Sequence, residues 1–93
     1  MQISIDEPDP NFAAELTAQI AALPKRGHRE KRILAVLNMP DSRRKRRILA
    51  RMERQAAAYL CVPVAEIDWS KVDWGKVLGT ILKILVALLP LLI

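Results

Sequence analysis

Apolar positions recur along this chain with the spacing of a helix, and no stretch alternates as a half-buried strand would. In the first such run, four large side chains lie on the same helical face: Phe12, Leu16, Ile20 and Leu23. Asp9 can cap a helix here, Pro10 suits its first position, and Pro24 ends the run. The pattern therefore predicts a first helix from about residue 10 to residue 23.

Two further amphipathic helices are expected. One runs from about His28 to Asn38, where Met39-Pro40 interrupts it, and its apolar face contains Ile33, Leu34 and Leu37. The next begins at Asp41 or Ser42 and ends near Cys61, before Val62-Pro63. Its apolar positions are Ile48, Leu49, Met52, Ala56, Tyr59 and Leu60. The sequence thus predicts an all-α protein that begins with three short amphipathic helices.

A local signal marks the start of the last helix. In Ser70-Lys-Val-Asp73, the serine hydroxyl can accept from the Asp73 amide, and the aspartate can reach back to the Ser70 amide, which is a capping box. In this register Trp69 and Trp74 occupy the two positions that pack together as a hydrophobic staple. The spacing predicts that a helix begins near Lys71.

The last helix, residues 71–93, is strongly hydrophobic. From Trp74 to the end it is about 30 Å long at ~1.5 Å per residue, which matches the hydrocarbon thickness of a bilayer. Lys83 lies near the middle and costs about 2.5–3.5 kcal/mol on insertion, which the surrounding Leu, Ile and Val residues can outweigh. The sequence predicts a C-terminal transmembrane helix, with Trp69, Trp74 and Lys76 at the membrane interface.

Small and polar residues form a narrow stripe along this helix: Lys76, Thr80, Lys83, Ala87 and Pro90. The stripe is compatible with a spanning helix that meets other copies or another protein, with a helix lying flat in the interface, or with a helix buried in a soluble protein assembly. For helix association we expect Gly79, Thr80, Lys83 and Ala87 to form the contact. Exposure of the whole helix to water is excluded.

Charge is segregated along the chain, which carries a net +5. Residues 1–24 contain four acidic and no basic residues, residues 25–54 contain twelve Lys or Arg against three acids, and residues 55–93 contain three of each sign. We therefore divide the chain into an acidic N-terminal segment (1–24), a basic helical pair (25–62), a linker with tryptophan and the helix cap (63–70), and the hydrophobic membrane helix (71–93).

The predicted third helix begins with a cluster of cations: Arg43, Arg44, Lys45, Arg46 and Arg47. A helix N-terminus already has positive potential, so this cluster favours an external anion. Anionic lipid headgroups are the first candidate because a membrane helix would hold the cluster beside them. Nucleic acid is the alternative, bound nonspecifically and sensitive to salt, since residues 25–54 contain no aromatic residue for stacking. An acidic protein surface is a third.

Catalysis has no support in these residues. Cys61 and His28 are the only members of their kinds, so we expect no disulfide, no tetrahedral metal site and no nucleophile–base pair. No Gly-rich phosphate loop is present. We therefore expect that the protein is not an enzyme and uses no cofactor.

These observations together favour a noncatalytic, tail-anchored structural or adaptor protein. We expect the basic helices to lie on an anionic surface, the C-terminal helix to cross the bilayer once, and other protein subunits or further copies to associate with it. The positive-inside rule places the N-terminal head in the cytoplasm, or in a virion interior, and the first residues lack the features of a secretory signal. The setting would be a larger assembly, such as a membrane-containing virion or a bacterial membrane complex.

Two other functions remain open. The composition of the last helix also resembles that of lytic peptides, so a membrane-permeabilising, holin-like oligomer is one alternative. Nonspecific nucleic-acid binding by the basic block is the other.

Overall fold

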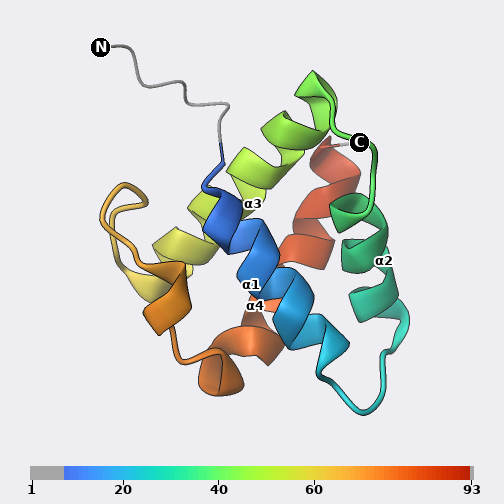
Figure 1. The fold of residues 1–93 in the computed structure, drawn as a ribbon, viewed down its shortest axis with the longest axis horizontal. Coiled ribbons are helices and arrows are strands. Elements are labelled where there is room, and N and C mark those ends of the chain that lie inside the picture. The colour runs from blue at the N-terminus through green and yellow to red at the C-terminus, as the bar shows by residue number, and fades with distance from the viewer. Residues whose placement is uncertain (1–7, 93) are drawn as a thin grey trace.

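The computed structural model describes residues 8–92 of this chain, and over that range it is built from helices without a strand. The elements are α1 (Pro10–Ala21), α2 (His28–Leu37), α3 (Arg43–Leu60), the 3₁₀ turn η1 (Trp69–Lys71) and α4 (Trp74–Leu92) (Figure 1). The all-α prediction is confirmed.

The first three helices begin and end close to the predicted residues. The Asp9 carboxylate accepts from the Asn11 amide at 2.9 Å, so α1 is capped as expected. The Ser42 hydroxyl caps α3 by accepting from the Lys45 amide at 3.1 Å. Cys61 follows the last residue of α3 and has the left-handed backbone conformation, with φ 60°, so the chain leaves the helix there.

One hydrophobic core joins all of these elements. The predicted face of α1 is confirmed, because Phe12, Leu16 and Ile20 are fully buried. Of the apolar positions named in α3, Met52 and Ala56 are fully buried, whereas Tyr59 is 41% exposed. The buried seam continues from Ala56 to Leu60, four positions on, and Tyr59 falls beside it. The radius of gyration, 12.5 Å, agrees with the ~12 Å of a compact chain this long.

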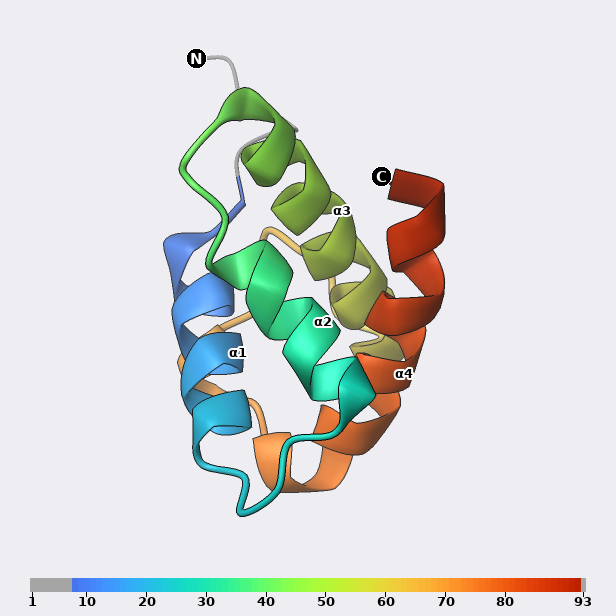
Figure 2. The same cartoon turned by 90° about the vertical axis from the view of Figure 1, so that its right-hand side faces the viewer.

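The helix α4 packs against α2 and α3, and Figure 2 shows it alongside both. Its side chains at helical spacing face this core: Trp74, Leu78, Ile81, Leu82, Leu85 and Leu89. The helix is also long and apolar enough to cross a membrane, since Trp74–Leu91 has a mean hydropathy of 1.7. From the sequence, this helix is expected to be buried in a bilayer or against another polypeptide. In the structure, one of its faces is covered by α2 and α3 of its own chain.

The predicted start of the last helix near Lys71, and the capping box behind it, are wrong. Asp68 accepts from both the Ser70 amide, at 3.1 Å, and the Ser70 hydroxyl, at 2.6 Å, so it caps η1 instead. Val72 is extended, with ψ 138°, which separates η1 from α4. The predicted contact between Trp69 and Trp74 is confirmed, with ring centroids 5.9 Å apart.

Candidate anion-binding end of the bundle

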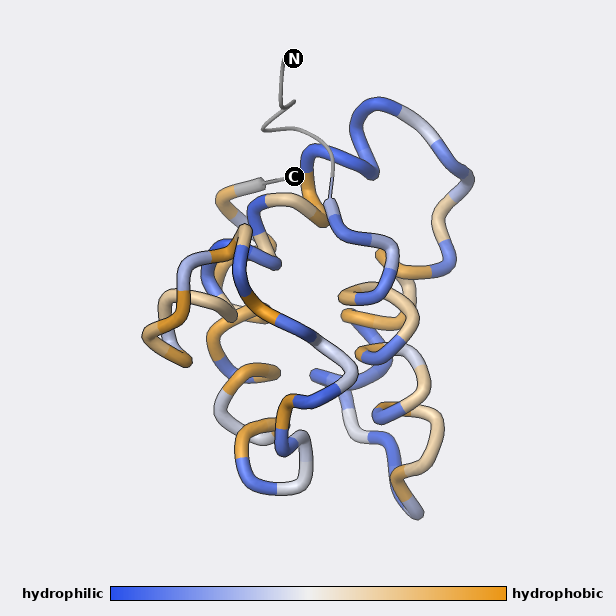
Figure 3. Tube along the Cα trace, turned by 60° about the vertical axis from the view of Figure 1, so that its left-hand side comes forward, coloured by the Kyte–Doolittle hydropathy of each residue, from blue (hydrophilic) through white to orange (hydrophobic). Residues whose placement is uncertain are grey.

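The cations that begin α3 gather at one end of the molecule. In Figure 3 a long hydrophilic stretch runs from the turn between α2 and α3 into the first turns of α3, and the C-terminal end of α4 lies at this same end. Two of the five predicted anion ligands already contact their own chain. The Lys45 ammonium donates to the Met39 carbonyl at 2.8 Å, and Arg46 lies 3.9 Å from the Asp41 carboxylate.

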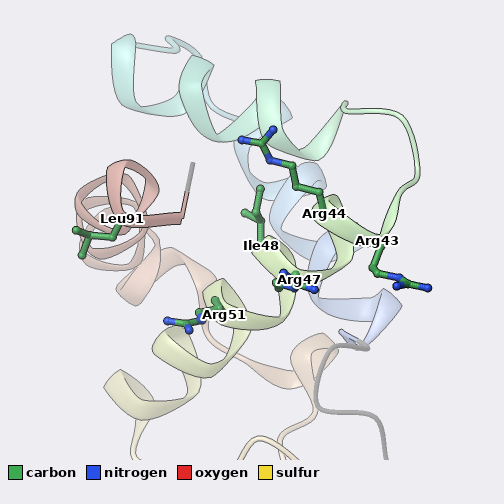
Figure 4. A pocket seen from close by; sticks show the side chains of 6 residues that line it. All are labelled: Arg43, Arg44, Arg47, Ile48, Arg51 and Leu91. Atoms are coloured by element: carbon green, nitrogen blue, oxygen red, sulfur yellow. The ribbon is translucent and has the colours of Figure 1, made fainter.

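A pocket of about 540 Å³ opens between α3 and the end of α4, lined by Arg43, Arg44, Arg47, Ile48, Arg51 and Leu91. Figure 4 shows Arg51 reaching from α3 toward the side where α4 ends and Arg44 extending toward α2, with Ile48 between them, while Arg43 points away. This follows from their spacing, because positions i, i+4 and i+7 share one helical face. Leu91 forms the opposite wall and is 82% exposed.

Arg51 is a site residue that the sequence analysis missed. The sequence singled out the continuous run 43–47, but a helix brings together residues three or four apart, not consecutive ones. The spacing of Arg44, Arg47 and Arg51 was the signal that could have found it.

The electrostatics of this pocket favour an anion. No carboxylate among residues 8–92 forms an ion pair with Arg43, Arg44, Arg47 or Arg51. The first turn of α3 adds the partial positive charge of a helix N-terminus. The pocket therefore combines guanidinium groups that have no ion pair within residues 8–92 with one exposed apolar side chain, Leu91, while Ile48 at its base belongs to the core.

Both tryptophans predicted at a membrane interface lie in the core of the bundle. Trp69 is fully buried and Trp74 is 4% exposed. The Trp74 indole donates to the Trp69 carbonyl at 3.0 Å, and the Trp69 ring packs against Phe12, with centroids 4.7 Å apart. The closed bundle thus keeps both rings from the surface. Lys76, the third predicted interface residue, is exposed and lies 3.7 Å from the Asp73 carboxylate.

Glu53 is the buried charged side chain within residues 8–92, and sequence reasoning did not single it out. Its two carboxylate oxygens accept from the Trp69 indole at 2.8 Å and from the Asp9 amide at 3.2 Å. Burial raises the pKa of Glu53, and these hydrogen bonds oppose that shift in part. Its position four residues after Leu49, on the apolar seam of α3, was the available signal. The contacts assign it a structural role.

The predicted association face is exposed. Gly79, Thr80, Lys83 and Ala87 all lie on the side of α4 that faces away from the core. A Cβ placed on Gly79 would meet nothing within 4 Å, so another helix has room to approach.

Within residues 8–92, no group of three or more His, Cys, Asp or Glu side chains is placed to hold a metal ion. Cys61 and His28 are both exposed, on different elements.

Comparisons of this chain with protein-family models, with curated proteins and with solved structures find no match.

Proposed function

We propose that this protein is a noncatalytic membrane adaptor, which attaches to an anionic membrane by the arginine-rich end of its folded bundle. The observation that carries the proposal is the position of Leu91. This exposed leucine at the end of α4 lies across a pocket from the guanidinium groups of Arg44 and Arg51. Cations that meet headgroups, next to an apolar side chain that can enter the interface, are what a peripheral membrane surface needs.

Energetics favour a lipid surface over the other anions. Each Lys or Arg near an anionic leaflet contributes about 1 kcal/mol, and the pocket alone supplies four arginines. Nucleic acid would use the same charges, but strand binding also uses aromatic side chains for stacking, and none lines this pocket. A phosphate backbone offers Leu91 no apolar surface to pack against, whereas a membrane gives it an apolar environment.

Vesicle flotation tests the proposal. We expect the full chain to float with phosphatidylglycerol vesicles and not with phosphatidylcholine vesicles, and to detach as salt rises. Arg44→Gln/Arg47→Gln/Arg51→Gln should abolish most of this binding. A matched variant, Lys25→Gln/Arg29→Gln/Arg32→Gln, removes the same charge from the segment around the start of α2 and should bind far better.

Equal losses in the two triple variants would contradict attachment by this end of the bundle. Tighter binding to a DNA duplex than to anionic vesicles at the same salt would overturn the proposal in favour of nucleic acid.

A second candidate is the spanning form, in which α4 crosses the bilayer as a tail anchor with the head on the cytoplasmic side. Its length and its mean hydropathy of 1.7 over Trp74–Leu91 favour it. That form must first separate α4 from α2 and α3, which exposes core residues such as Ile33 and Met52 to water. Attachment of the folded bundle requires no such rearrangement, and we therefore prefer it to the spanning form.

Carbonate extraction separates the two forms. A surface-bound bundle leaves the membrane in alkaline carbonate, and a spanning helix stays. Dye release from the same vesicles reports on the permeabilising alternative: intact vesicles with bound protein support an adaptor, and leakage that Lys83→Leu abolishes supports a pore.

A further inference from the structure

Resting on the proposed attachment to membranes, we infer that the pocket between α3 and the end of α4 binds the phosphomonoester headgroup of a single lipid molecule. The pocket would thus recognise a particular headgroup in addition to the overall charge of the surface.

Two arginines from one face of α3 line this pocket together. Arg44 and Arg51 are one helical turn on either side of Ile48, and in Figure 4 their guanidinium groups lie above and below the space between α3 and the end of α4. The Cα atoms of Arg44 and Arg51 are about 10 Å apart along the helix axis, at ~1.5 Å per residue, and both side chains are long enough to turn toward one phosphate. Arg47 borders the same space.

The charge of the pocket fits a phosphomonoester better than a phosphodiester. A monoester carries between −1.5 and −2 charges at about pH 7 and has three acceptor oxygens, while a diester carries one charge. Arginine pairs with phosphate through two parallel hydrogen bonds, and the four N–H donors of two arginines find three acceptor oxygens and a larger negative charge on a monoester. None of the lining arginines forms an ion pair with residues 8–92 that would have to break first.

The apolar walls indicate a lipid as the source of the phosphate. Ile48 lies between the arginines, and Leu91 stands opposite with most of its side chain exposed. A free phosphate ion would contact neither. Ile48 is already buried in the core at 2% exposure, so the apolar surface that the first methylenes of a lipid would remove from water is that of Leu91.

Calorimetric titration of the full chain with short-chain lipids below their micellar concentration tests this inference without a membrane. We expect dihexanoyl phosphatidic acid to bind about tenfold more tightly than dihexanoyl phosphatidylglycerol or inorganic phosphate. Arg44→Gln/Arg51→Gln should abolish this preference. Arg29→Gln/Arg32→Gln, with the same loss of charge, should retain this preference. Leu91→Ser should weaken the binding of the lipid but not the binding of inorganic phosphate.

The outcomes distinguish this inference from the proposed function. Equal affinity for the two lipids, in a protein that floats with anionic vesicles, overturns the headgroup site and leaves membrane attachment intact. Selective binding of phosphatidic acid by a protein that binds no vesicle supports the site and overturns the attachment. Equal affinity for inorganic phosphate and phosphatidic acid overturns the lipid assignment. Circular dichroism of each variant confirms that its helices remain.

Discussion

Glu53 and Trp69 form the buried hydrogen bond on which three segments of the chain converge. Through this carboxylate, α3 is joined to η1 and, by the Asp9 amide, to the start of α1. We expect Trp69→Phe to lower the free energy of unfolding by at least about 1–3 kcal/mol, because it leaves a buried carboxylate oxygen without its donor. Urea unfolding measures this loss. An unchanged midpoint would show that the bond contributes nothing to stability.

The raised pKa of Glu53 gives a pH dependence of definite sign. Because the folded protein holds this proton more tightly than the unfolded chain, the stability contributed by the protonated group is present below its ordinary pKa of 4.5 and is lost as the pH rises through the folded value. Relative to Glu53→Gln, the wild type should therefore lose stability as the pH rises above the ordinary pKa of 4.5. Urea unfolding at a series of pH values checks this, and a difference that stays constant or grows in favour of the wild type would contradict it.

Single residues differ in how far the sequence determines their place. The caps at Asp9 and Ser42 were predictable because each acts on an amide two or three residues away. The burial of Glu53 could be read from its place on the apolar face of α3, but its partners could not, since Trp69 and Asp9 lie 16 and 44 residues away and only the folded chain brings them together. Arg51 was predictable in principle, from its helical spacing alone.

At the scale of elements, the turn before α4 shows two caps in competition. Asp68 holds the Ser70 amide and hydroxyl, and these bonds lower the pKa of Asp68 below its ordinary 3.8. We therefore expect Asp68→Ala to destabilise the protein more than Ser70→Ala does, and the advantage of the wild type over Asp68→Asn to disappear only as the pH falls through the lowered pKa. Thermal unfolding of these variants measures both effects. A larger loss for Ser70→Ala would instead support a cap centred on Ser70.

The two faces of α4 should respond differently to substitution. Lys83 is exposed, so Lys83→Leu should change the stability of the bundle by no more than about 0.5 kcal/mol. Leu85 is fully buried, and Leu85→Ala should cost about 2–5 kcal/mol. Urea unfolding in plain buffer compares the two. Equal and small effects would mean that α4 does not pack on α2 and α3 in solution.

The type of each element could be predicted from hydrophobic period and capping, and the start of α4 could not. Both Asp68 and Ser70 are good cap residues two positions apart, and local sequence does not decide between them. Trp69 packs against Phe12 on α1 and against Trp74, and this tertiary packing fixes the backbone there.

At the scale of the whole molecule, α4 illustrates why hydropathy alone does not assign an environment. A helix of this length and composition suits a bilayer, yet six of its side chains are buried against the rest of the chain. Figure 2 shows the helix lying alongside α2 and α3. From the sequence, the apolar segment is predicted as separate from the basic head, because periodicity along one helix contains no information on which partner covers it. The same packing brings the end of α4 beside the arginines of α3, which creates the candidate site.

Spin labels at the two ends of the bundle test the central claim most directly. In a Cys61→Ser background, labels at Leu91→Cys and at Ala65→Cys report on the arginine end and on the loop after α3. With the protein bound to phosphatidylglycerol vesicles, we expect the label at residue 91 to be shielded from a water-soluble relaxation agent and the label at residue 65 to remain accessible. Equal accessibility of the two labels in the vesicle-bound protein would contradict attachment of the folded bundle by its arginine-rich end.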